Sequence, residues 1–199
     1  MSTNDRPADV LRRYLGAARE ALLWKLDGLG ERDVRLPRTP TGTNLLGIVL
    51  HCANVEIGYF GPTFARAWPE PDHPCLIPDD AYDLDPQADW WVPADISTPA
   101  VVDFYRAAGA FCDAVFDELP LDAVGRVPWW PEERAEVSLH AISVHVLSDI
   151  ARHAGHADVL REQADGAAGM RAAARNLPDG FDWPAYVDRL TGIADSFPD

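Results

Sequence analysis

The chain has 199 residues, of which 47% are hydrophobic and 25% charged, a composition typical of globular proteins and not of disordered chains. Its formal charge of −15 at pH 7 argues against nucleic acid and anionic membranes as partners, because both attract clustered Lys and Arg. We also expect a cytoplasmic protein without a membrane span, since no long apolar run or signal peptide stands out and three cysteines are too few for a disulfide framework.

Apolar residues recur every three or four positions in four segments, which predicts four principal helices. These segments cover residues 8–29, 44–59, 99–119 and 135–164, and a shorter helix is predicted over residues 184–194. No segment shows the clean alternation of a strand. We therefore predict an all-α fold, a four-helix bundle in which each helix buries its apolar face against the others.

The connections between these helices differ greatly in length. A polar turn precedes the second helix, with Thr41 or Thr43 as its expected N-cap. The second and third helices are joined by residues 61–97, and the third and fourth by residues 120–135, both rich in Pro and Trp. Connections this long are usually functional or wrap the surface, so we expect a pocket beneath them.

The whole chain, residues 1–199, is expected to form one domain. Its bundle core covers about residues 8–166, and residues 167–199 form a short C-terminal extension.

Histidines gather in the fourth predicted helix, which holds four of the six in the chain. At about 100° per residue, His145, Asp149, His153 and His156 share less than a quarter of the helix circumference, whereas His140 points elsewhere. Asp149 and His153 are four residues apart, a spacing that lets two side chains of one helix approach a single ion.

His51 lies midway along the second predicted helix, among apolar residues. A lone histidine there is more often a hydrogen-bonded core residue than a ligand. If the second and fourth helices face each other, however, His51, Asp149 and His153 would hold a divalent metal and leave positions open for water or substrate. We take this triad as the predicted metal site, with a polar core cluster as the alternative.

Residues near the predicted triad have alternative predicted roles. His156 would be a fourth ligand, or a catalytic proton shuttle beside the metal. Arg152 would bind an anionic group of a cofactor or substrate, or pair with nearby acids. Glu56 is expected at the surface or beside the site, and His73 in solvent.

Two stretches of the chain resemble a known superfamily. TNLLGIVLHCANVEIGYF and DIARHAGHADVLREQADG are similar to the second- and fourth-helix signatures of the DinB-like metal-binding four-helix bundles. The branch that the chain most resembles is related to mycothiol-dependent maleylpyruvate isomerase and to low-molecular-weight thiol S-transferases. The resemblance covers about residues 8–166, and NLPDGFDWPAYVDRL in the tail is also similar to that branch.

This resemblance implies a metal triad at His51, Asp149 and His153. The second position is often His across the superfamily and often Glu in this branch, whereas here it is Asp149, one methylene shorter than Glu. The resemblance further implies zinc or nickel as the ion, mycothiol as a co-substrate, and a homodimer.

The implied reaction is attack of a metal-activated small thiol on an electrophilic small molecule, in a transferase or an isomerase. Two alternatives remain open at this stage. One is a non-catalytic or stress-response metal-binding protein, and the other is a hydrolase that uses metal-bound water.

Overall fold

The structure is a computed structural model that describes residues 6–172 and 174–198. Most of the described residues lie in helices, which agrees with the all-α prediction, and the connections between the helices include one two-stranded sheet. The four long helices are α1 (Pro7–Trp24), α3 (Leu45–Phe60), α5 (Thr98–Glu118) and α7 (Leu139–Asp165). Their ends differ from those of the four predicted segments by a few residues.

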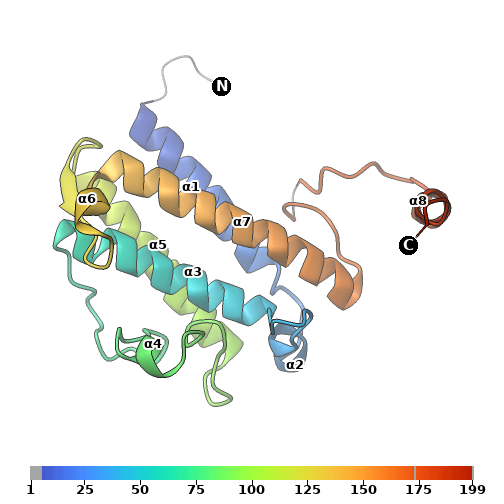
Figure 1. Ribbon diagram of the computed structural model, residues 1–199, viewed down its shortest axis with the longest axis horizontal. Helices are drawn as coiled ribbons and strands as arrows, with labels where there is room; N and C mark the ends of the chain where they lie inside the picture. The colour runs from blue at the N-terminus through green and yellow to red at the C-terminus, as the bar shows by residue number, and fades with distance from the viewer. Residues whose placement is uncertain (1–5, 173, 199) are drawn as a thin grey trace.

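Each long helix packs against two or more of the others. Helix α3 contacts both α5 and α7, and α1 contacts both α7 and α5 (Figure 1). Fully buried side chains such as Leu15, Leu46 and Ile142 fill the space between them. Most of the apolar positions that predicted the helices are therefore buried between them, whereas Tyr14 and Val159 are exposed.

Side-chain caps determine where three of these helices begin. The Asn44 side chain accepts a hydrogen bond from the Gly47 backbone N–H at 2.7 Å, so the N-cap of α3 is Asn44 and not Thr41 or Thr43. Ser97 and Ser138 cap α5 and α7 in the same way.

The connection that precedes α7 contains elements that the sequence did not predict. Residues 135–138, expected to open the fourth helix, form instead the last residue of α6 (Glu132–Ala135) and the strand β2 (Glu136–Ser138). Strand β2 pairs antiparallel with β1 (Val124–Arg126), with Gly125 opposite Val137. Strands of three residues are too short to show a period, which is why the pattern of the sequence missed them.

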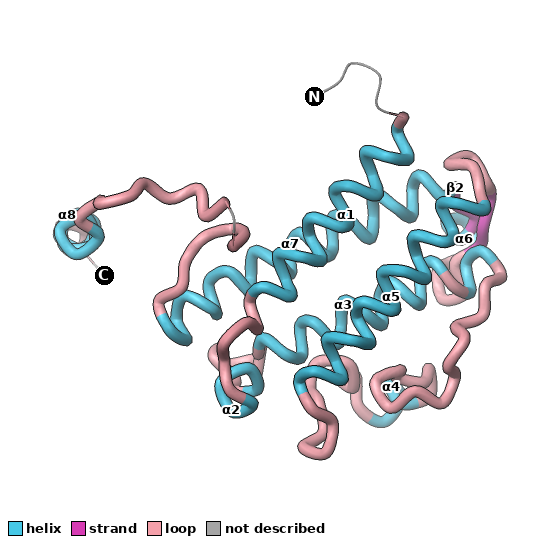
Figure 2. The backbone as a smooth tube through the Cα atoms, turned by 180° about the vertical axis from the view of Figure 1, so that it is seen from behind, coloured by secondary structure: helices cyan, strands magenta, loops and turns pink. Residues whose placement is uncertain are grey.

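The remaining connections carry short helical turns: α2 (Glu31–Arg35), the 3₁₀ turn η1 (Pro62–Phe64) and α4 (Ala81–Leu84). Figure 2 shows the long loop that carries α4, which lies beside α3 and α5. Cys75, Ala88 and Asp89 of this loop are buried, so it is packed against the helices and covers part of α3.

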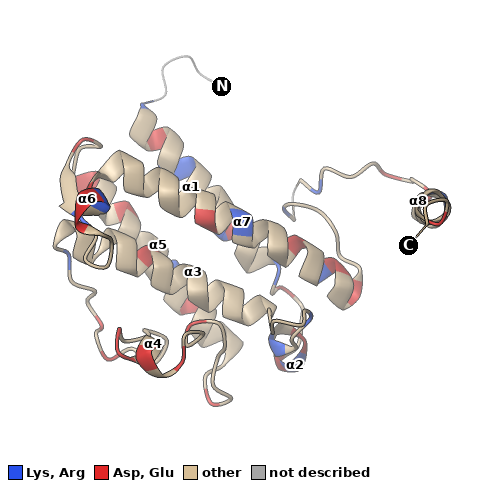
Figure 3. Cartoon of the chain, viewed as in Figure 1, with Lys and Arg blue, Asp and Glu red and all other residues tan. Residues whose placement is uncertain are grey.

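Helix α8 (Trp183–Ala194) stands apart from the four long helices at the end of an extended segment (Figure 1). Lys25 anchors the start of that segment, because its buried ammonium group pairs with Asp158 of α7 and donates to the carbonyl of Gly169. Figure 3 shows Asp and Glu spread over several elements, α7 and α4 among them, rather than gathered on one.

One segment, Leu45–Phe64, is long and apolar enough to cross a membrane by length and composition, although the sequence analysis predicts no membrane span. Its most apolar window is 67% buried inside the structure, as in the core helix of a globular protein, so it is weak support for a membrane span.

Candidate metal centre

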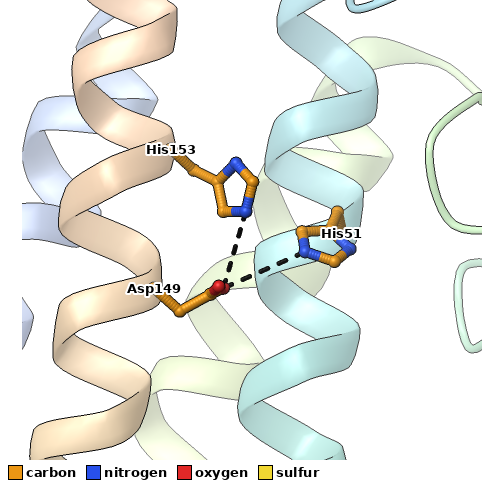
Figure 4. A group of neighbouring side chains, drawn as sticks. All are labelled: His51, Asp149 and His153. Atoms are coloured by element: carbon orange, nitrogen blue, oxygen red, sulfur yellow. Dashed lines mark ion pairs between the residues drawn. The ribbon is translucent and has the colours of Figure 1, made fainter.

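Three side chains from two helices meet between α3 and α7. His51 comes from α3, and Asp149 and His153 come from successive turns of α7 (Figure 4). Asp149 Oδ2 lies 3.6 Å from His153 Nε2 and 3.9 Å from His51 Nε2. One ligand atom from each residue lies within 4.8 Å of the others, so the structure brings the three predicted ligands together.

The local sequence explains this convergence. Asp149 and His153 are one turn apart on α7, so both point to the same side of that helix. Ile142, Val146 and Ile150 bury the adjoining face of α7. Because α7 packs against α3, His51 meets the polar stripe of α7 at the helix–helix contact.

The donor atoms fit a divalent ion. Asp149 Oδ2 is buried and, among the described residues, has no hydrogen-bond partner, while Nε2 of His153 and Nε2 of His51 face it from 3.6 and 3.9 Å. A buried carboxylate oxygen without a hydrogen bond is costly, and a cation would compensate it. Ligands that each lie about 2 Å from one ion are themselves about 3–4 Å apart, close to the separations from Asp149 to the two histidines.

The charge state of Asp149 also suits a ligand. Burial tends to raise the pKa of Asp149, but His153, His51 and His145 outweigh this effect and hold the pKa below its ordinary value. The carboxylate is therefore ionised at neutral pH, as coordination requires.

Asp89 is a functional candidate that the sequence reasoning missed. His51 Nδ1 lies 2.7 Å from Asp89 Oδ2, and Asp89 is 5% exposed. Since a carboxylate accepts, Nδ1 donates, which leaves Nε2 of His51 with its lone pair toward Asp149. The only sequence signal was an acidic residue before Trp90 and Trp91 in a long connection.

Trp90 covers the other side of the cluster. Its ring stacks on His51 at 4.2 Å between centroids and meets His153 edge-on at 5.1 Å. The loop of Asp89 and Trp90 therefore orients His51 and shields it from water at the same time.

The structure places His156 and Arg152 on the exposed part of α7 beside the cluster. The His156 ring lies 5.5 Å from that of His153, near enough for a role next to the ion. Arg152 precedes His153 in the chain and its side chain is exposed. The shuttle role of His156 and the anion-binding role of Arg152 stay predictions.

The structure corrects the expectations for His73 and Glu56, and it also shows that Cys52 is buried. His73 is partly buried and stacks on Phe104 at 4.6 Å, so it is not simply solvated. Glu56 is fully buried in an ion pair with Arg19. Cys52 is buried beside His51, and burial raises the pKa of its thiol, which removes it as a nucleophile at neutral pH.

A comparison with protein families now connects this geometry to known proteins. The family model described as mycothiol S-transferase matches residues 10–166. The chain belongs to this family. The match covers α1 through α7 and contains all three candidate ligands, which bears out the resemblance to the DinB-like superfamily.

The mycothiol S-transferase family suggests activity on a thiol and an electrophile, with the His-Asp-His cluster as a possible metal site. No curated protein matches the chain in the comparison.

Proposed function

We propose that this chain is a divalent-metal-dependent S-transferase that joins mycothiol, or a closely related small thiol, to an electrophilic small molecule. The observation that carries the proposal is the convergence of His51, Asp149 and His153 around a buried carboxylate oxygen that has no hydrogen-bond partner among the described residues, in a chain of this family. Zinc or nickel is the proposed ion, because imidazole and carboxylate ligands suit both.

The protein's own residues would hold the ion and leave room for substrate. His51, Asp149 and His153 supply three ligands, and Asp89 keeps His51 in the tautomer that binds. A divalent ion held there would lower the pKa of a thiol and so supply a thiolate at neutral pH. The thiol must come from outside the chain, since Cys52, Cys75 and Cys112 are all buried.

In the proposed reaction the thiolate sulfur donates the electron pair of a new C–S bond. A leaving group departs with its own bonding pair, or, in an addition, the neighbouring atom takes up a proton. We assign that proton to His156, which lies beside His153 at the exposed edge of the cluster. Arg152 is the proposed contact for a polar or anionic part of the thiol co-substrate.

We also propose a domain organisation, an oligomeric state and a location for the protein. We infer a single domain over residues 1–199, with a DinB-like four-helix bundle made by α1, α3, α5 and α7, and with residues 167–199 as an extension. The contacts of these helices support the bundle. Apolar side chains of α8 are exposed, among them Val187, Leu190 and Ile193, and they support a homodimer as their cover. The cytoplasm is the proposed location.

The first test measures metal binding and thiol conjugation in parallel. Metal content and affinity are determined for the wild type, His51→Ala and Asp149→Ala, with Asp95→Asn as an exposed acidic control. We expect about one ion per chain, lost in both site variants and kept in the control. Conjugation of mycothiol to a model electrophile should follow the metal content.

Two results would overturn the proposal. A folded wild type that binds no divalent ion would leave the histidines as a polar core cluster in a binding protein. Turnover that needs the metal but not the thiol would favour the hydrolase alternative.

A further inference from the structure

A large cavity lies along α3, beyond the metal cluster. Its volume is about 910 Å³, within the range of small-molecule sites. The walls come from the second half of α3, from the loop that carries α4, and from Pro128 and Trp129 before α6. Both long connections of the chain therefore contribute to it.

The cavity is connected to the metal cluster through α3 and Asp89. Asn54, Val55, Gly58 and Tyr59 line it, and they follow His51 on α3 by three, four, seven and eight residues. At about 100° per residue these positions lie within roughly 80° of His51 around the helix. Asp89 lies on the cavity wall and accepts a hydrogen bond from His51 Nδ1, so one residue connects the cavity to the cluster.

Apolar and aromatic side chains form most of the walls. They include Val55, Tyr59, Trp68, Leu76, Ile77 and Trp129. Flat rings among these side chains offer stacking and edge contacts to a ring of the ligand. The surface therefore favours an apolar, ring-sized compound.

The charges on the walls favour one sign of ligand. Asp79 and Asp89 are carboxylates, and the cation Arg66 is already paired with Glu118, at 2.8 Å from its Nε. Asp89 is engaged with His51 Nδ1, so Asp79 is the carboxylate on the walls for which the structure gives no such partner among the described residues. An anionic ligand would thus meet the Asp79 charge and no uncompensated cation among the described wall residues, which is unfavourable.

We propose that this cavity binds the electrophilic substrate and that this substrate is an apolar, ring-sized molecule, uncharged or cationic, and not a carboxylate. The identification of the ligand as the electrophile depends on the proposed function, whereas the preference for size and charge depends only on the cavity.

The test measures binding without chemistry. Naphthalene-2-methanol, 2-(aminomethyl)naphthalene and 2-naphthoate share one ring system and differ in charge. Their dissociation constants are determined by calorimetry on the full-length, metal-loaded protein without thiol. We expect the neutral and cationic compounds to bind at least tenfold more tightly than the anion.

A pair of glycine variants locates the site. A Cβ at Gly58 would lie 3.5 Å from the Trp129 ring, so Gly58→Leu places its longer side chain in the cavity. Gly16→Leu on α1 is the matched control, because a Cβ there has open space around it. Gly58→Leu should weaken binding of the neutral compound at least tenfold, and Gly16→Leu should not, with thermal unfolding confirming that both variants fold.

A variant that removes a wall charge tests which ligand charge the cavity prefers. Asp79→Asn should tighten binding of 2-naphthoate about twofold at low salt, and the exposed control Asp95→Asn should leave it unchanged. Equal affinity for the three compounds, or binding that Gly58→Leu leaves intact, would overturn the inference.

The two proposals fail in different ways. Metal binding and mycothiol conjugation with no discrimination among the naphthalene compounds would remove this inference alone. Charge-selective binding that Gly58→Leu abolishes, in a protein without thiol-transfer activity, would keep the cavity and remove the proposed function.

Discussion

Asp89 lies outside the three candidate ligands and holds one of them, His51, by a hydrogen bond. It holds His51 from the side opposite Asp149, and it comes from a loop rather than from a helix. Carboxylates in this position fix the ring and raise the basicity of the ligand nitrogen.

Replacing Asp89 with Asn should therefore weaken metal binding without removing it. The amide keeps the shape but not the charge, so we expect the dissociation constant for zinc to rise about 10- to 100-fold. A competition titration with a chromophoric chelator measures this change. Asp95→Asn, in the same loop and exposed, should match the wild type, and an unchanged affinity in Asp89→Asn would mean that Asp89 does not orient the ligand.

Glu56 acts on the stability of the core. Its carboxylate is fully buried and bonds the Arg19 guanidinium through Nε and Nη2, while Arg19 also reaches Asp113. Burial opposes the charged form of Arg19, but Glu56 outweighs it and holds the pKa of Arg19 above its ordinary value.

Removing the charge of Glu56 should strongly destabilise the fold. Glu56→Gln leaves a buried guanidinium without its main partner, and we expect the free energy of unfolding to fall by about 3–5 kcal/mol. Urea denaturation measures the loss. The control is Glu118→Gln, at the exposed end of α5, where loss of the pair with Arg66 should cost no more than about 1 kcal/mol. Similar losses in both variants would contradict this account.

Among the elements, the long helices were predictable and the loop that completes the site was not. Periodicity located α1, α3, α5 and α7, and the helical spacing of Asp149 and His153 placed both on one face. The sequence has no local signal for the contact of Asp89 with His51, because 38 residues separate them and the packing of the loop on α3 brings them together.

Gly47 explains how that loop reaches α3. A Cβ at this position would lie 2.0 Å from the Trp90 carbonyl oxygen, so only glycine permits the approach. Gly47→Ala should move Trp90 and Asp89 away from His51 and weaken zinc binding at least tenfold, as a chelator competition measures. Gly16→Ala, which meets open space on α1, should leave the affinity unchanged. Equal affinities in the two variants would mean that the loop adapts.

Helix α2 supports the start of α5 through a pH-dependent contact. The Glu31 carboxylate accepts from the backbone N–H and the hydroxyl of Thr98, both at 2.8 Å, and pairs with Arg35. The Thr98 backbone hydrogen bond, followed by the hydroxyl and Arg35, lowers the pKa of Glu31 below its ordinary value.

A lowered pKa in the folded state means that the unfolded chain takes up the proton first. The stabilisation by Glu31 is then complete above the unfolded pKa of about 4.3 and disappears as the pH falls through the folded pKa. In urea denaturation Glu31→Gln should be less stable than the wild type at pH 7, and the difference should shrink below about pH 4. A difference that stays constant with pH would rule out the carboxylate charge as its source.

Across the whole molecule, the sequence predicted the helical content but not the separation of α8 from the rest. The spacing of Tyr186, Leu190 and Ile193 indicates an amphipathic helix, but an amphipathic face does not say what covers it. No side chain of α8 is buried among the described residues, whereas the start of the extension is attached through Lys25.

Lys25 is the only lysine in the chain, and it is 1% exposed. A protease that cuts only after lysine therefore has a single target bond, which the folded molecule conceals. Arg161 strengthens this protection by donating to the carbonyls of Lys25 and Asp27. We expect the digestion rate to follow the unfolded population, and to rise with urea at the slope of the equilibrium transition. A cleavage rate that does not change with urea concentration would mean that the region around Lys25 opens locally. If cleavage follows the urea transition, the single cleavage product on a gel measures global unfolding of the protein.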